Sequence, residues 1–445
     1  MKHSMPFFLL IIFAIFCQPT NATIIHVPGD SSTIQGAVNG AVHGDTILVA
    51  PGVYNENVVC SCRAILLTSG YLFDHDSLTI NSTIIDGSGG DALFLSGGNC
   101  FPEDESLTVM GFTIRNSTNG VWKELADWYA EPRSKSRICH NRFIGNSWGI
   151  FTLTWDFCVI DHNIFINNMF GAQCWGGLSL MTKIPQPPPR MTIVENNVFS
   201  FNSEIGADAV GGAIAIFRDN VFSYNRWGMA KGYNSGLAAE RNIVYNNAIG
   251  VYCEALGSAW EDLGIFLENN IIAKNDTGIF IYGSGMGDTI IRYNDLWGNF
   301  DRDFIGCPAG VGDTTWGTNF NGTPCDSFYN ITKDPLFADT IDFELRCNSP
   351  CIDAGDSGAP VPESGGCRID IGKNEFSYII GDVNSDFVID IVDVVFVINY
   401  LFVEGPAPCP YHSGDTNCDG IVDVQDIVCW INFLFCGSTF PCFKR

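Results

Sequence analysis

The chain has 445 residues, of which 46% are apolar and 16% charged, and its 49 Asp and Glu residues far outnumber its 23 Lys and Arg residues. The apolar content excludes intrinsic disorder, and the length indicates either one long repetitive domain or two domains. The net charge of −26 makes nucleic acid an unfavourable partner because phosphates are repelled, whereas the surplus of carboxylates suits divalent cations.

The N-terminus has the layout of a secretory signal peptide, which we assign to residues 1–22. Lys2 and His3 precede an apolar run over residues 7–16, and Thr20-Asn21-Ala22 is a small-x-small cleavage signal. The apolar run is too short to span a membrane, which argues against an anchor. We therefore expect a mature chain that is secreted, extracellular or associated with the cell surface, without membrane insertion.

Cleavage after Ala22 leaves 17 of the 18 cysteines. Export to an oxidising compartment favours disulfides, and the odd number leaves at least one thiol without an intramolecular partner. Five cysteines lie between Cys307 and Cys367 and five between Cys409 and Cys442, so local bridges near the end of the chain are expected. Their connectivity stays open.

A repeat of the form Asn-x-apolar-x-x-Asn covers residues 141–299. Its base period is near 22 residues, and apolar and polar residues alternate within each unit, which is typical of a solenoid of short strands. A leucine-rich repeat is disfavoured because the Leu pattern is missing. We predict a right-handed parallel β-helix of about a dozen coils, in which the Asn residues stack and hydrogen-bond to one another. The seven copies begin at Asn141, Asn163, Asn197, Asn220, Asn242, Asn270 and Asn294.

The sequences before and after the repeat contain patterns that could close the two ends of the solenoid. Residues 33–42 predict a short amphipathic helix that covers the first coil, with Ser32 as its N-cap. The run that follows, residues 45–54, resembles the opening of secreted β-helix proteins of the pectate-lyase-like class. Residues 334–337, 349–355 and 370–372 resemble the closing segment that often follows bacterial β-helix repeats. The resemblance spans roughly residues 23 to 375 and implies the fold rather than one chemistry.

Two acidic loops lie 33 residues apart near the C-terminus, and an apolar helix is expected after each. Side-chain oxygens fall at loop positions 1, 3, 5, 9 and 12, and a backbone carbonyl falls at position 7, which is the EF-hand pattern for Ca²⁺. The predicted ligands are Asp382, Asn384, Asp386, Val388, Asp390 and Asp393 in the first loop, and Asp415, Asn417, Asp419, Ile421, Asp423 and Asp426 in the second.

The duplicated loop–helix unit is similar to a type I dockerin, because position 12 is Asp and no helix precedes either loop. The resemblance spans about residues 379 to 442 and implies docking to a cohesin module on a scaffold or surface protein. In that family, loop positions 10 and 11 help to choose the partner. Here those positions are Ile391, Val392, Val424 and Gln425, which depart from the hydroxyl pair common in cellulosomal dockerins.

The two loops differ at position 6, where a residue that tolerates positive φ is needed. The second loop has Gly420 there, whereas the first has the bulky Phe387. We therefore predict that the second loop binds Ca²⁺ more tightly.

An aromatic pattern also recurs in the repeat. Trp148, Phe170 and Trp227 occupy equivalent places, two residues after the second Asn and just before a Gly. The pattern favours an aromatic column packed inside the solenoid, since stacked aromatic pairs stabilise a core. The alternative is an exposed stripe, in which case Trp148 and Trp227 would stack on sugar rings.

Catalytic residues stay unassigned. Carboxylate pairs such as Asp156 with Asp161, or Glu204 with Asp208, occur without a diagnostic spacing. Because dockerins usually accompany enzymes that cut polysaccharides, the leading hypothesis is a protein that processes or binds extracellular polysaccharide and docks to a cohesin. The alternative is a non-catalytic, adhesin-like surface protein.

The predicted organisation is a signal peptide over residues 1–22, a β-helix over residues 23–378 and a dockerin over residues 379–445. The fold class is therefore an all-β right-handed parallel β-helix solenoid. It is followed by a small α-helical, calcium-binding module of paired EF-hand-like loops.

Overall fold

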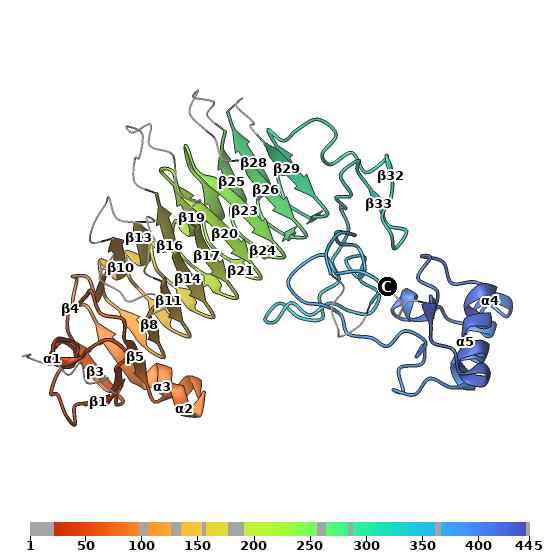
Figure 1. Ribbon diagram of the computed structural model, residues 1–445. Helices are drawn as coiled ribbons and strands as arrows, with labels where there is room; N and C mark the ends of the chain where they lie inside the picture. The colour runs from red at the N-terminus through yellow and green to blue at the C-terminus, as the bar shows by residue number, and fades with distance from the viewer. Residues whose placement is uncertain are drawn as a thin grey trace, which may run out of the picture.

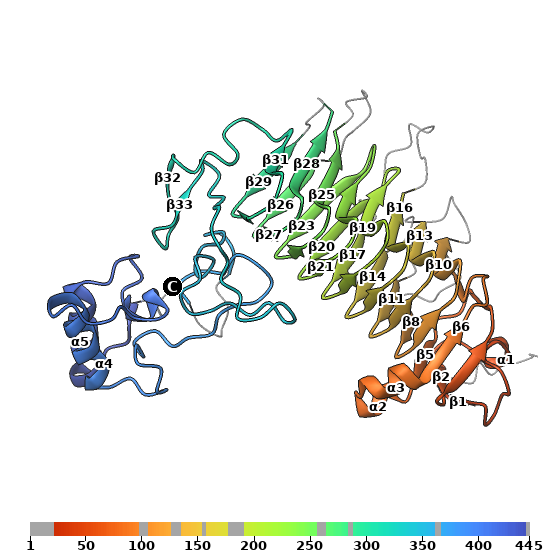
Figure 2. The same cartoon turned by 180° about the vertical axis from the view of Figure 1, so that it is seen from behind.

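The computed structural model describes residues 22–97, 106–125, 135–153, 157–176, 191–255, 264–283, 288–360 and 366–441. The predicted signal peptide lies outside these residues except for Ala22. The described chain forms a parallel β-solenoid, an irregular closing segment and a two-helix module (Figure 1). Helix α1 lies at one end of the molecule and helices α4 and α5 lie at the other, as Figure 2 shows from behind. The all-β solenoid expected from the repeat is confirmed.

Three parallel sheets, named A, B and C, form the walls of the solenoid, and each strand pairs with its counterpart in the next coil. They have 11, 10 and 10 strands, slightly fewer than the dozen coils expected. Sheet A contains β1 (Ile24–Val27), β2 (Thr46–Val49), β5 (Leu66–Ser69), β8 (Ser106–Met110), β11 (Lys135–Cys139), β14 (Phe157–Asp161), β17 (Met191–Glu195), β20 (Ile214–Arg218), β23 (Gly236–Glu240), β26 (Ile265–Glu268) and β29 (Thr289–Arg292). Sheet B contains β3 (Gly52–Asn55), β6 (Thr83–Asp86), β9 (Thr113–Arg115), β12 (Arg142–Ile144), β15 (Ile164–Ile166), β18 (Val198–Ser200), β21 (Val221–Ser223), β24 (Ile243–Tyr245), β27 (Ile271–Ala273) and β30 (Asp295–Trp297). Sheet C contains β4 (Val58–Ser61), β7 (Leu93–Gly97), β10 (Asn119–Leu125), β13 (Trp148–Leu153), β16 (Phe170–Trp175), β19 (Ile205–Val210), β22 (Trp227–Lys231), β25 (Ile249–Glu254), β28 (Thr277–Tyr282) and β31 (Arg302–Ile305).

The repeated Asn residues form two buried columns, one at each end of sheet B. In the first column, Asn220 Nδ2 donates to Asn242 Oδ1 at 3.0 Å and to the Val194 carbonyl at 2.8 Å. Asn220 Oδ1 accepts from the backbone and side-chain nitrogens of Asn197 at 2.9 and 3.0 Å. The second column repeats this arrangement, for example between Asn225 and Asn247. The expected stacking is therefore present, and it satisfies backbone groups at the turns of the coils that carry the repeat.

Aromatic rings stack inside the solenoid on sheet B. Phe143, Phe165, Phe199 and Phe222 occupy one register position in successive coils, and all are fully buried. Their ring centroids lie 4.5–4.9 Å apart in parallel stacks. Burying one such ring contributes about 1.5–3 kcal/mol, so this column is a large part of the core.

Three short helices lie near the first coils. Helix α1 (Ile34–Gly40) packs Ile34, Ala37 and Val38 into the core, as a cover of the first coil should. Its N-cap is Thr33, whose Oγ1 accepts from Gly36 N at 3.0 Å, and not Ser32 as expected from sequence. The other two helices are α2 (Tyr71–Asp74) and α3 (Ser77–Ser82).

The C-terminal module consists of α4 (Ile391–Phe402), the short 3-10 helix η1 (Tyr411–Gly414) and α5 (Val424–Cys436). In its described residues, the closing segment before it has two regular elements, the short strands β32 (Gly317–Thr318) and β33 (Pro324–Cys325). No helix of the described residues is both long and apolar enough to cross a membrane.

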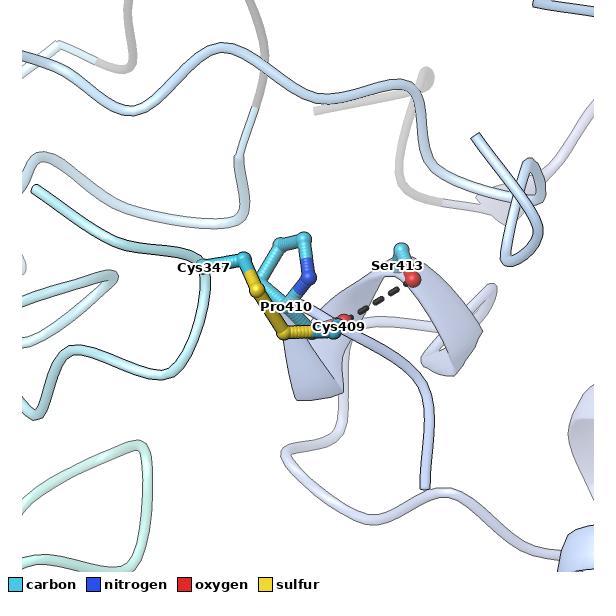
Figure 3. The surroundings of a disulfide bond; sticks show 4 residues. All are labelled: Cys347, Cys409, Pro410 and Ser413. Carbon is cyan, nitrogen blue, oxygen red and sulfur yellow. Dashed lines mark hydrogen bonds between the residues drawn. A yellow bond between two sulfur atoms is a disulfide. The ribbon is translucent and has the colours of Figure 1, made fainter. Parts of the chain in front are cut away.

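A disulfide joins the closing segment to the connection between α4 and α5. Cys347 and Cys409 are bonded with a Cα–Cα distance of 5.3 Å, beside Pro410 and Ser413 (Figure 3). The Ser413 hydroxyl donates to the Pro410 carbonyl at 2.8 Å, which stabilises η1 directly after the bridge. This bridge lies near the end of the chain, where bridges were expected, and it joins one cysteine cluster to the other because the closing segment packs against the module.

Asp353 of the closing segment lies fully buried at the same boundary. Its Oδ2 accepts from the Tyr378 hydroxyl at 2.5 Å and lies 3.0 Å from His412 Nδ1. Its Oδ1 accepts from the backbone nitrogens of Cys367 and Arg368 at 2.7 and 2.9 Å. One buried carboxylate therefore holds the closing segment, the entry to the module and η1 together.

Candidate functional site

The first acidic loop is folded around its own carboxylates. Asp382, at position 1, accepts from the backbone nitrogens of Asp386 at 3.1 Å and Phe387 at 2.8 Å. Asp393, at position 12, accepts from the backbone nitrogens of Val383 and Asp390, both at 2.9 Å. These bonds turn the loop so that positions 1 and 12, at its two ends, both contact its backbone.

The second loop repeats these contacts 33 residues later. Asp415 accepts from the backbone nitrogens of Asp419 at 3.1 Å and Gly420 at 2.8 Å. Asp426 accepts from the backbone nitrogens of Asn417 at 3.2 Å and Asp423 at 2.8 Å. The two loops thus share one hydrogen-bond pattern, as their shared sequence pattern predicts.

The position 9 carboxylates begin the two helices. Asp390 caps α4 by accepting from Val392 N, and Asp423 caps α5 by accepting from Gln425 N, each at 2.6 Å. Both helices also have a complete capping box with the position 12 Asp. The loop residues therefore start each helix as well as forming the loop, which couples loop order to helix order.

Burial raises the pKa of a carboxyl in each loop, and the larger rise is in the second loop. Asp415 and Asp426 are both fully buried. Burial, followed by repulsion from Asp415, raises the pKa of Asp426 to about 6, and burial also raises the pKa of Asp393 in the first loop. A donor set made only of oxygen atoms and rich in buried carboxyls fits a hard cation such as Ca²⁺, which would offset their repulsion.

The side chains at the remaining predicted positions reach the surface. Val388 and Ile421, at position 7, are 55% and 59% exposed, which leaves their backbone to serve the loop. The residues predicted to choose a partner, Ile391, Val392, Val424 and Gln425, are all exposed at the starts of α4 and α5.

Apolar side chains extend this exposed surface along both helices at matching positions. They are Val395, Ile398 and Phe402 on α4, and Val428, Ile431 and Phe435 on α5. The sequence marked only the first residues of this surface.

Trp148 and Trp227 lie on the outer face of sheet C, and both are half-buried. The expectation of an interior column at this position is wrong, because the core residues of these strands are Ile150 and Met229. Trp148 stacks on Phe170 in the next coil with ring centroids 5.4 Å apart.

Further aromatic residues extend this outer face. Trp227 stacks on Tyr252 with a centroid distance of 4.3 Å. Trp122 contacts Phe94 and Phe151 edge to face at 5.8 and 6.2 Å. The outer face of sheet C therefore presents linked aromatic rings over several consecutive coils.

Asp208 lies among these rings on the central strand β19. It is 3% exposed, and its Oδ2 accepts from Gln173 Nε2 at 2.9 Å. Trp148 Nε1 donates to Gln173 Oε1 at 3.2 Å, so a chain of hydrogen bonds crosses three coils. Asp208 Oδ1 is buried without a hydrogen-bond partner, and burial raises the pKa of this carboxyl to about 7. Its former candidate partner, Glu204, pairs instead with Arg226.

A second polar cluster lies on the outside of sheet A. Both Asp161 oxygens are held by Arg137, at 2.8 and 2.6 Å, and His162 Nδ1 lies 2.9 Å from Asp161 Oδ2. Cys139, His140 and Asp161 place potential ligand atoms within 4.8 Å of one another. Because Arg137 and His162 already occupy Asp161, this cluster is better explained as a structural ion pair. Asp156, the other residue of that candidate pair, lies outside the described residues.

Together these features define a parallel β-solenoid that carries a duplicated loop–helix module. Residues 189–323 match the family described as a right handed beta helix region, and residues 380–435 match the dockerin type I domain. The solenoid is therefore a right-handed parallel β-helix, and the C-terminal module is a type I dockerin. No curated protein matches the chain.

Several solved structures have a weak similarity to the chain. Pectate lyase Pel9A shares 13% identity over 79% of this chain and 96% of its own, with a TM-score of 0.45. The A-module of the mannuronan C-5 epimerase AlgE6 from Azotobacter vinelandii shares 16% identity over 60% of this chain and 72% of its own, with a TM-score of 0.40. An alginate lyase from Paenibacillus sp. str. FPU-7 shares 10% identity over 64% of this chain and 96% of its own, with a TM-score of 0.33.

Proposed function

We propose that this protein is secreted, binds extracellular polysaccharide on its β-helix, and docks through its calcium-loaded dockerin to a cohesin on a scaffold or surface protein. The observation that carries the docking role is the pair of matching oxygen-lined loops, each of which starts a helix with an exposed apolar surface. We assign the signal peptide to residues 1–22, the β-helix to residues 23–378 and the dockerin to residues 379–445.

The six residues assigned to each loop would hold one Ca²⁺. Asp382, Asn384, Asp386, Asp390 and Asp393 supply side-chain oxygens in the first loop, and Val388 supplies its carbonyl. The ion would neutralise carboxylates that otherwise repel one another, and the capping boxes would transmit this order to α4 and α5. Docking is therefore expected to depend on calcium.

The β-helix would bind polysaccharide on the outer face of sheet C. Trp148 and Trp227 are half-buried and face outward, and flat apolar rings of this kind suit the apolar faces of sugar rings. In the described part of this face, the buried Asp208 is paired with an amide, Gln173, rather than with a second carboxylate. This arrangement favours binding over hydrolysis, because glycosidases use two carboxyl groups across the scissile bond.

Docking and polysaccharide binding can be tested separately on the full-length mature protein. A panel of immobilised cohesins should retain it in Ca²⁺ and release it in EDTA. An Ile391→Asp, Val424→Asp double variant should lose retention while keeping its thermal stability. Retention that is equal in Ca²⁺ and EDTA would argue against the docking role.

A panel of soluble polysaccharides, followed by assays for reducing ends and for unsaturated products, tests the β-helix. Binding without product supports a binding protein, and product formation supports an enzyme. If no polysaccharide is bound or altered, the non-catalytic, adhesin-like alternative is favoured.

A further inference from the structure

The outer face of sheet C contains a buried carboxyl that the solenoid itself leaves incompletely paired. Asp208 is 3% exposed, and its Oδ1 has no hydrogen-bond partner. Trp122 Nε1, on the same face, is likewise buried without a partner. Native proteins pair nearly all buried polar atoms, so Asp208 Oδ1, without a partner among aromatic rings, is a position where a ligand can supply the missing hydrogen bond.

The neighbours of Asp208 show on which side hydrogen bonding is incomplete. On β16, Gln173 lies opposite Asp208 in the strand register and donates to its Oδ2 at 2.9 Å. On β22, the residue opposite is Ala230, whose methyl group offers no hydrogen bond. Trp227 and Tyr252 stack immediately beyond, with centroids 4.3 Å apart. An aromatic platform therefore lies next to a carboxyl with an unused oxygen.

The charges on this face disfavour an anionic ligand. Besides the neutral Asp208, its outward positions include the carboxyls of Glu124 and Glu254. Among the described residues of the sheet C strands the outward cation is Arg302, on the last strand. Lys123 and Lys231 belong to the interior row and are 2% and 0% exposed.

Arg226, beside the platform, is neutralised by Glu204 at 2.5 Å. A uronate polymer would therefore bring negative charge to a face that already carries an excess of carboxyls.

We propose, on the basis of the polysaccharide-binding role above, that this face binds an uncharged polysaccharide, with Asp208 as its hydrogen-bonding anchor and Trp148 and Trp227 as stacking surfaces. Asp208 Oδ1 is closed to solvent in this structure, so binding requires the side chains that cover it to move aside. The carboxyl then donates its proton to a sugar oxygen from Oδ1 while Gln173 holds Oδ2. Trp148 is tied to the anchor through Gln173, so stacking and hydrogen bonding are positioned together.

The anchor requires the neutral form of Asp208, which gives the proposal a pH signature. Burial raises the pKa of this carboxyl to about 7. On the strands paired with β19, the titratable side chains are Cys174 and Lys231, which both lie on the interior row. If the neutral form alone binds, apparent affinity should fall about 30-fold between pH 5.5 and 8.5.

Other charged groups in contact with β19 or near the platform are few among the described residues. Arg218 on β20 pairs with Glu195, Glu204 pairs with Arg226, and Tyr252 and Glu254 lie on β25, beyond β22. The Asp208→Asn variant removes the anchor's titration and leaves all of these groups unchanged, so it isolates the contribution of Asp208.

The test uses the full-length mature protein in calorimetric titrations with xylan, mixed-linkage glucan and galactomannan as uncharged probes. Polygalacturonate and alginate serve as uronate probes, each with Ca²⁺ and with EDTA. Wild type should bind at least one uncharged probe, and Trp227→Ala should weaken this binding more than tenfold. Tyr224→Ala, which removes an exposed ring stacked on Phe201 outside sheet C, should not change it.

The pH series tests this proposal separately from the broader proposal that the β-helix binds polysaccharide. Affinity of wild type should fall about 30-fold from pH 5.5 to 8.5, whereas Asp208→Asn should show a flat profile while being at least as stable to heat as wild type at both pH values. Preferential binding of uronates that still depends on Trp227 would overturn this inference and leave the proposed function standing. Matching pH profiles of wild type and Asp208→Asn would do the same. Failure of every polysaccharide to bind would overturn both.

Discussion

Replacing Phe387 by Gly is expected to strengthen calcium binding at the first dockerin loop. Phe387 has a φ of +67° at loop position 6, and Gly420 has a φ of +91° at the same position of the second loop. A residue with a Cβ costs about 1–2 kcal/mol in this region, whereas Gly occupies it freely. If a calcium-free loop can relax out of this conformation, Phe387→Gly should lower the Kd of the first loop by about 5- to 30-fold.

The rest of the two loops supports assigning the difference to position 6. Asp382 and Asp415 receive equivalent backbone bonds, and both helices have capping boxes with Asp at position 12. The reciprocal change, Gly420→Ala, should weaken the second loop. A Cβ there would be strained by the positive φ and would lie 3.3 Å from the Phe320 carbonyl oxygen.

Competition with a fluorescent chelator on the full-length protein measures both affinities. Asp415→Ala isolates the first loop and Asp382→Ala isolates the second. Without a change at position 6, the second loop should bind Ca²⁺ with the lower Kd. Phe387→Gly should reduce the difference between the Kd values of the two loops. Equal affinities of the two isolated loops, or no response of the first loop to Phe387→Gly, would refute the reasoning.

Three further predictions concern stability, and denaturant unfolding of the full-length protein measures each. Asn220→Ala removes four buried hydrogen bonds and should cost about 3–5 kcal/mol, whereas Ala at the exposed Asn348 should change stability by less than about 0.5 kcal/mol. Cys347→Ser removes the disulfide to Cys409, which lies 62 residues further along the chain. This change should lower the free energy of unfolding of the closing segment and dockerin by about 4 kcal/mol. Burial raises the pKa of Asp208 in the folded state from 3.8 to about 7, so the carboxyl ionises more readily in the unfolded chain. The free energy of unfolding of wild type therefore falls as pH rises from about 4 to 7, and the loss stays constant at higher pH. Asp208→Asn should therefore gain stability relative to wild type over that window, by up to roughly 4 kcal/mol, and show no gain at pH 3.

The solenoid was predictable because its Asn residues have an obligatory role in each coil that carries the repeat. Each column Asn donates to the Asn of the next coil and accepts from the Asn of the preceding coil, so the spacing of these residues equals the length of one coil. The positive φ of the residue before each Asn of the first column was not predictable. His140, Asp219 and Tyr293 all adopt a positive φ there although they share no chemistry. The backbone path around the turn, rather than the side chain, imposes that conformation.

The aromatic residues of sheet C were predicted to point into the solenoid but lie on its outer face, and the reason is local. Gly149 and Ile150 both face the interior, since a Cβ on Gly149 would meet the Phe165 ring at 2.7 Å and Ile150 is a core residue. Two consecutive inward residues break the alternation of a strand, so Trp148 lies outside. The importance of Asp208 could not be seen in sequence either, because Gln173, its partner, lies 35 residues away.

The dockerin loops were predictable in their shared hydrogen-bond pattern and in the positive φ at position 6, but not in their surroundings. Phe320 of the closing segment contacts His412 with ring centroids 5.0 Å apart, and Arg368 stacks on it at 4.2 Å. The same Phe320 lies against Gly420, so the second loop is packed on the closing segment. Phe387 of the first loop, by contrast, is 83% exposed.

This packing links the order of the second loop to the end of the β-helix. The Cys347–Cys409 bridge and the buried Asp353 hold η1 in place, and η1 leads directly into Asp415. A cation in the second loop would therefore also stabilise the boundary between the two modules. A cation in the first loop would act mainly on α4, which begins in that loop, and on the contacts of Gly381 with Ser413 and Trp430. Because the loop predicted to bind Ca²⁺ more tightly lies at this boundary, depleting calcium should first loosen α4 and only later the connection to the β-helix.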